Sequence, residues 1–120
     1  MAANKFKLDR LCAVVDVNGL QIDGRTEDVM PTAPLDKKLE AFGWHVETAD
    51  GHDFDSLAAA FDRAAAHTGQ PTAILAKTVK GKGVSFMEND PDWHGKAPND
   101  EQYERAAAEL KAALARWEVE

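Results

Sequence analysis

An asparagine stands after the first apolar run of the chain, where its side chain could bind a metal ion. The segment reads Val15-Asp16-Val17-Asn18-Gly19-Leu20. The carboxamide oxygen of Asn18 and the backbone carbonyl of Leu20 could point the same way as two neutral oxygen ligands. Mg²⁺ accepts such ligands and takes the rest of its shell from water and a bound phosphate. Asn-Gly is also a common turn signal, so spacing alone leaves a plain turn open as the alternative.

Lysines alternate with glycines in a second segment, Lys77–Gly83, and the segment Trp93–Pro98 follows it. Glycine leaves the backbone accessible, so these lysines could approach an anionic group closely. His94 could donate a hydrogen bond or carry a proton near neutral pH. The alternative is a flexible basic loop with a surface histidine. The spacing of a Walker-type phosphate loop is absent.

The remaining histidines and the single cysteine give weaker signals. Gly51-His52-Asp53 is most simply a turn followed by a helix cap, and we interpret His45 and His67 as structural or solvated. The four histidines do not have metal-ligand spacing. Cys12 has apolar neighbours, which predict a buried, inert thiol.

The bulk composition restricts the class of protein. The chain has 120 residues, 44% of them hydrophobic and 29% charged, which suits one small globular domain or part of a larger one. A net charge of −7 argues against a nucleic-acid binder. No apolar run is long enough to span a membrane, and no signal-peptide pattern opens the chain. A single cysteine allows no internal disulfide, so we expect a cytoplasmic protein without a membrane partner.

Three apolar segments are predicted to form strands. Leu11–Val15 is a continuous apolar run, typical of a strand buried on both faces. Trp44–Thr48 alternates, and Thr72–Ala76 is apolar throughout.

Helices are expected between these strands and after the last one. Pro34 should open the first helix and Gly43 should end it, Asp53 should cap the second, and Asn99 with Gln102 has capping-box spacing before the third. The apolar faces predicted for the three helices are Leu35, Leu39 and Phe42; Phe54, Leu57, Ala58, Phe61 and Ala65; and Tyr103, Ala107, Leu110, Leu114 and Trp117.

The order β-α-β-α-β-loop-α predicts an α/β fold with a three-layer parallel sheet and right-handed crossovers. Such a sheet binds ligands at the carboxyl ends of its strands.

Taken together, three segments resemble transketolase. Lys7–Gly24 is similar to the tail of the family's thiamine diphosphate signature, Lys77–Asn89 resembles a loop after a later strand, and Trp93–Pro98 resembles a His-Gly-x-x-Pro-type segment. The resemblance covers essentially the whole chain and is closest to the N-terminal, thiamine diphosphate-binding subunit of split transketolases. It implies residues 1–120 as a single, partial diphosphate-binding domain.

The resemblance implies roles for four residues. The Asn18 side chain and the Leu20 carbonyl would ligate the Mg²⁺ or Ca²⁺ that holds the cofactor's diphosphate. Ile22 would pack against the cofactor, and His94 would contact diphosphate or substrate oxygens and assist proton transfer. The implied activity is transfer of a two-carbon ketol unit between ketose and aldose phosphates, as in the pentose phosphate pathway. Other thiamine diphosphate enzymes, such as deoxyxylulose-phosphate synthase or a 2-oxoacid dehydrogenase subunit, are close alternatives.

One departure from the family pattern limits these expectations. The Gly-Asp-Gly motif, whose aspartate also ligates the metal, has no counterpart in the seventeen residues before Asn18. Met1 therefore resembles an internal methionine, with a strand and a helix missing upstream. We expect a homo- or hetero-oligomer with a pyrimidine-binding subunit, inactivity of the isolated chain, and an open apolar side on the first strand. A non-enzymatic α/β remnant acting only as an interaction module is the alternative from another class.

Overall fold

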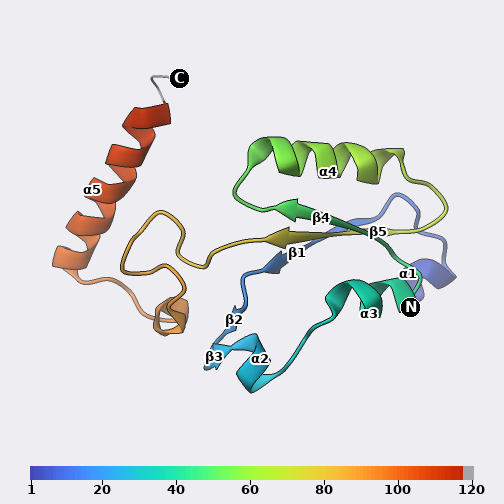
Figure 1. Ribbon diagram of the computed structural model, residues 1–120, viewed down its shortest axis with the longest axis horizontal. Helices are drawn as coiled ribbons and strands as arrows, with labels where there is room; N and C mark the ends of the chain where they lie inside the picture. The colour runs from blue at the N-terminus through green and yellow to red at the C-terminus, as the bar shows by residue number, and fades with distance from the viewer. Residues whose placement is uncertain (118–120) are drawn as a thin grey trace. The chain divides into compact units, whose positions relative to one another are not determined.

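A computed structural model describes residues 1–117 of the chain, which divide into two compact units (Figure 1). The first unit comprises Met1–Asn18 and Pro31–Thr78, and the second comprises Gly19–Met30 and the chain from Val79 onward. Each unit is described by itself below.

The first unit is built on a parallel sheet of three strands. Its order is β1 (Cys12–Val17), β5 (Thr72–Lys77), β4 (His45–Asp50), with Cys12 and His45 both opposite Thr72. Helix α3 (Leu35–Ala41) precedes β4, and α4 (Phe54–Ala66) joins β4 to β5. The two helices lie on opposite sides of the sheet (Figure 1), and a short α1 (Ala2–Lys5) precedes β1. The α/β class with a parallel sheet flanked by helices is confirmed.

The prediction that the first strand is buried on both faces is wrong. Exposed and half-buried residues alternate along β1, and Val14 is 52% exposed. The reason is its position, because β1 is an edge strand that pairs only with β5, whereas α4 packs on β4 and β5. Cys12 is exposed for the same reason, which corrects the expected buried thiol. The buried strand is β5, in which every residue from Thr72 to Ala76 is buried.

Helix α4 begins as predicted but buries a different face. The Asp53 carboxylate accepts hydrogen bonds from the amides of residues 55 and 56, which confirms the cap. Ala60 and Ala64 are buried with Leu57 beside them, in a core shared with Ala49 and Ile74. Of the predicted apolar face, Leu57 packs against the core as expected, but Phe54, Phe61, Ala58 and Ala65 are exposed. Small alanines let the helix approach the sheet closely, and the bulkier phenylalanines are left outside.

The predicted bounds of the first long helix are close to the observed ones. Pro34 is the N-cap of α3, and Leu35 is its first helical residue. Gly43 has a φ of +82°, which ends the helix as expected because glycine adopts this conformation without strain. Phe42, predicted on the apolar stripe, is 47% exposed.

The second unit contains a small hairpin that the local sequence patterns did not predict. Strand β2 (Leu20–Gln21) pairs antiparallel with β3 (Gly24–Arg25), and α2 (Thr26–Val29) follows. A 3₁₀ turn, η1 (Pro91–His94), precedes the long helix α5 (Asp100–Trp117).

The start of α5 is the predicted capping box. The Gln102 carboxamide accepts a hydrogen bond from the Asn99 amide at 3.0 Å, and the Asn99 side chain accepts one from the Gln102 amide at 2.8 Å. Along α5, Tyr103, Leu110 and Leu114 are exposed. The Trp117 side chain, also predicted on this stripe, lies outside the described part of the structure.

A cluster of charged and aromatic side chains ties α4 to β4. Arg63 Nε donates to Glu47 Oε2 at 2.7 Å, and His45 Nε2 lies 2.8 Å from Glu47 Oε1. The Arg63 hydrogen bond, with a smaller contribution from His45, holds the pKa of Glu47 below its usual range although partial burial opposes the shift. The His45 ring stacks on that of His67 with centroids 3.9 Å apart, which agrees with a structural reading of both histidines.

Introducing a larger side chain at a buried position should test which face of α4 is buried. Ala60 has no exposed surface, so Ala60→Leu forces extra atoms into the core and should cost about 1–3 kcal/mol of unfolding free energy. Ala59→Leu, at the exposed neighbouring position, should change it by less than about 0.5 kcal/mol. Urea unfolding followed by circular dichroism measures both. Equal costs for the two variants would contradict the assigned face.

The lowered pKa of Glu47 predicts a pH-dependent stability. A carboxyl group whose pKa falls on folding stabilises the protein above the pKa it has in the unfolded chain, and that stabilisation is lost as pH falls through the lowered value. Glu47→Gln should therefore cost on the order of 1 kcal/mol at neutral pH, since Arg63 is half exposed, and almost nothing near pH 3. Urea unfolding across this pH range gives the difference.

Glu40→Gln is the matched control, because the Glu40–Lys37 pair lies exposed on α3 of the same unit. Its effect should stay below about 0.5 kcal/mol at every pH. A Glu47→Gln penalty that persists at pH 3 would exclude the carboxylate as its source.

Candidate functional site

The carboxyl ends of the three parallel strands are joined by hydrogen bonds. Thr78, directly after β5, donates its hydroxyl to the Asp16 carboxylate near the end of β1. The Gly51 amide, directly after β4, donates to the Lys77 carbonyl at 2.7 Å. Asn18, half-buried, is the first residue after β1 and so lies at this end of the sheet.

Gly51 is required by a close approach at the same end. A Cβ atom at this position would overlap the Thr78 methyl group and would lie 2.9 Å from the Lys77 carbonyl oxygen. The turn after β4 therefore packs directly against the carboxyl end of β5. His52 lies in this turn, which agrees with the turn-and-cap reading of Gly51–Asp53.

The other predicted site residues lie in the second unit. Leu20 begins β2, and Ile22 lies between β2 and β3 with 61% of its surface exposed. His94 is the last residue of η1 and is exposed. Since β2 contacts η1, the structure brings the strand of Leu20 beside the turn that carries His94.

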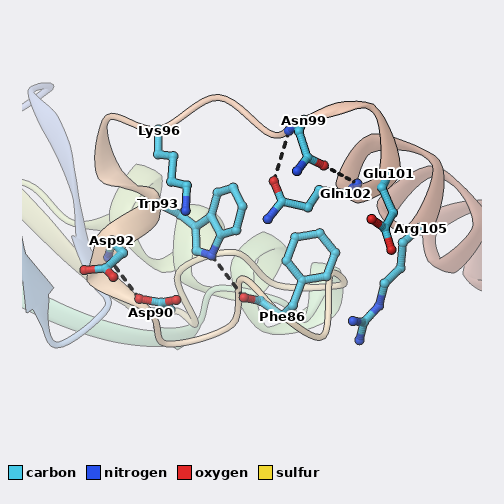
Figure 2. A pocket seen from close by; sticks show the side chains of 9 residues that line it. All are labelled: Phe86, Asp90, Asp92, Trp93, Lys96, Asn99, Glu101, Gln102 and Arg105. Carbon is cyan, nitrogen blue, oxygen red and sulfur yellow. Dashed lines mark hydrogen bonds between the residues drawn. The ribbon is translucent and has the colours of Figure 1, made fainter.

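The turn that carries His94 is fixed by its neighbours. The Asp90 carboxylate caps it by accepting from the Asp92 amide at 3.0 Å, and Pro91 supplies a preset first residue. The indole N–H of Trp93 donates to the Phe86 carbonyl at 3.0 Å, and the two rings meet edge to face. These residues border a cavity of about 350 Å³ (Figure 2). Its lining is Phe86, Asp90, Asp92, Trp93, Lys96, Asn99, Glu101, Gln102 and Arg105.

The lysine-glycine segment forms a closed loop. The Asn89 amide donates to the Lys80 carbonyl at 2.9 Å, and the Gly83 amide donates to Glu88 at 3.0 Å. Gly81 has a φ of +74° and packs against the backbone of Met87, so its lack of a side chain is required. These contacts argue against the flexible-loop alternative.

A carboxylate on helix α5 accepts hydrogen bonds from the same loop. Glu109 accepts hydrogen bonds from the Ser85 amide at 2.6 Å and the Ser85 hydroxyl at 2.8 Å. These two bonds, followed by Arg105, hold the pKa of Glu109 below its usual range.

The donors predicted for a metal are oxygens, and no acidic cluster accompanies them. Among residues 1–117, no three His, Cys, Asp or Glu side chains are grouped so that they could hold a metal ion. Sequence reasoning missed the β2–β3 hairpin, although the turn signal Asn18-Gly19 precedes it and the turn signal Asp23-Gly24 lies where its turn meets β3. It also missed the Thr78–Asp16 bond and the Trp93–Phe86 bond, for which no local pattern exists.

Comparison with known proteins gives a consistent result over nearly the whole chain. Residues 1–116 match the family model "Transketolase, thiamine diphosphate binding domain". The chain is 42% identical over 111 residues to the 6-deoxy-6-sulfo-D-fructose transketolase subunit SqwG of Clostridium sp. (strain MSTE9), covering 92% of this chain and 40% of that protein. It is 41% identical to an apulose-4-phosphate transketolase subunit of Actinobacillus succinogenes, with the same coverage. The chain thus spans about 40% of the length of these relatives.

A solved structure agrees with the fold. The crystal structure of transketolase from Campylobacter jejuni superposes with a TM-score of 0.81 at 27% identity, over 89% of this chain and 17% of that one. Within the described residues, the helices all lack the combination of length and apolar character that a membrane span needs.

Gly51→Ala should test the close approach at the strand ends. The added methyl group has no space beside Thr78 and Lys77, so we expect a loss of about 1–3 kcal/mol in unfolding free energy. Thr78→Ser, which removes the obstructing methyl group and keeps the hydroxyl for Asp16, should recover part of that loss in the double variant. A double-mutant cycle by urea unfolding measures the coupling. If the changes in unfolding free energy of the two single variants simply add in the double variant, Gly51 and Thr78 are not in close contact.

Proposed function

We propose a cofactor-holding role for this chain, which belongs to the transketolase family through the thiamine diphosphate-binding domain. The observation that carries the proposal is the family match over residues 1–116, together with Asn18 at the carboxyl end of the sheet. Parallel α/β sheets bind ligands at that end. The group bound there is thiamine diphosphate with a divalent metal.

The metal is held by the Asn18 side chain and the Leu20 backbone carbonyl. Both donors are neutral oxygens, which are ligands suited to Mg²⁺ or Ca²⁺ rather than to softer metals. The donor chemistry fits part of a metal–diphosphate site, because such an ion takes its remaining ligands from phosphate and water.

Ile22 and His94 contact the organic part and the reacting groups. Ile22 offers an exposed apolar side chain between β2 and β3, suited to the apolar face of the cofactor. His94 donates a hydrogen bond to diphosphate or substrate oxygens and assists proton transfer there. The contact between β2 and η1 supports a shared role for Leu20 and His94.

The reaction is transfer of a two-carbon ketol unit from a ketose phosphate to an aldose phosphate. Thiamine diphosphate supplies the carbanion stabilisation when it is bound. The chain's own residues orient the diphosphate and position a proton at the substrate oxygen. The names of the relatives, an apulose-4-phosphate and a sulfo-fructose transketolase, support an anionic sugar as substrate.

Activity requires a second polypeptide in this proposal. The two relatives are named as subunits, and this chain spans about 40% of their length. We infer a partner that carries the pyrimidine-binding part, in a cytoplasmic oligomer. The isolated chain then binds the cofactor weakly and has no ketol-transfer activity.

Titration of the ¹⁵N-labelled chain with thiamine diphosphate and Mg²⁺, followed by NMR, tests the site. We expect shift changes at Asn18, Leu20, Ile22 and His94, with a dissociation constant in the millimolar range. Asn18→Ala should weaken the response by about tenfold or more, since a metal ligand is lost.

Two controls separate the diphosphate from the rest of the molecule. Thiamine without diphosphate should leave the Asn18 and His94 signals unchanged. Asn4→Ala should bind like the unaltered chain, because Asn4 lies beside Gly43, before β4, at the amino end of the sheet. An unchanged affinity of Asn18→Ala would refute the metal assignment. A lack of binding even with the partner present would favour the interaction module.

A further inference from the structure

We propose that Trp93 is a positioning residue for His94, acting through the backbone of the turn that both residues share. The proposal rests on the proposed function, because it concerns how His94 is held ready for the diphosphate or the substrate. Trp93 itself need not touch the cofactor or any reacting atom.

The His94 imidazole depends on its backbone for its place. Within residues 1–117, the structure records no hydrogen bond to this ring, and the residue is exposed. Its position is therefore set by the η1 turn rather than by side-chain partners of its own. A contact that holds the backbone of this turn therefore also holds the His94 imidazole in position.

Trp93 attaches this turn to the preceding loop. Its indole N–H donates to the Phe86 carbonyl at 3.0 Å, a bond that joins residues seven positions apart. The Phe86 ring meets the indole edge to face, with centroids 5.4 Å apart. One side chain thus makes both a hydrogen bond and a ring contact, and it belongs to the residue next to His94.

Two cations extend the ring pair on either side (Figure 2). Lys96 Nζ lies 5.0 Å from the centre of the Trp93 ring, and the Arg105 guanidinium lies 4.9 Å from that of Phe86. Arg105 is a residue of α5, so the series of contacts reaches this helix, and Arg105 also donates to Ser85 and Glu109. The turn is thereby held against the longest helix of its unit.

Trp93→Phe tests the proposal, because phenylalanine keeps a ring but lacks the N–H donor. We expect the backbone NMR order parameter of His94 to fall from the rigid range of about 0.85 to below about 0.6. The response of the His94 signal to magnesium pyrophosphate should weaken about fivefold, as expected for one lost hydrogen bond. Trp44→Phe, a matched change in the first unit, should alter neither quantity.

The outcomes separate this proposal from the proposed function. An unchanged His94 order parameter in Trp93→Phe overturns the positioning role. If the unaltered chain shows no His94 response to pyrophosphate while Trp93→Phe still loosens the turn, the positioning of the turn stands and the diphosphate role of His94 falls.

A measurement on the unaltered chain covers the case in which Trp93→Phe fails to fold. The indole N–H of Trp93 should exchange with solvent at least about fivefold more slowly than a free indole, because it is hydrogen-bonded and part-buried. Exchange at the free rate would overturn the proposal without any variant.

Discussion

The arrangement of the first unit depends on the two hydrogen-bonded ladders of β5. Within residues 1–117, both β1 and β4 pair only with this strand, and its residues from Thr72 to Ala76 are buried. At its carboxyl end, the Lys77 carbonyl accepts a hydrogen bond from the Gly51 amide, and the hydroxyl of Thr78, the next residue, donates one to the Asp16 carboxylate. The position of Asn18 therefore follows from a strand more than fifty residues further along the chain. These contacts determine where the carboxyl end of the sheet lies.

Sequence patterns were reliable where the determining contacts are local. The caps at Asp53 and Asn99 were predicted because a cap is a bond between residues two or three positions apart. The exposure of Cys12 and the buried face of α4 were not predicted, because they depend on which strand lies at the edge of the sheet. Several stripes of α4 are apolar, and long-range packing selects the one whose small alanines fit against the sheet.

The candidate site shows the same limit. The roles of Asn18, Leu20, Ile22 and His94 followed from resemblance, whereas local spacing left a turn and a surface histidine as alternatives. The Trp93 bond to the Phe86 carbonyl has no sequence signature, since any residue supplies a carbonyl and only the fold selects the partner. A tertiary contact of Trp93 therefore holds the turn that carries His94.

The register of β1 against β5 also has a consequence for the order of folding. Cys12 pairs with Thr72, so this ladder closes a loop of some sixty residues, whereas α5 and the capped turns need only neighbours in sequence. Loop-closure entropy makes such long-range parallel pairing slow. During synthesis, β1 emerges well before β5, and Val14 and the unpaired backbone of β1 stay accessible until β5 has left the ribosome. Strand β1 thus gains its partner only after some sixty further residues have been made.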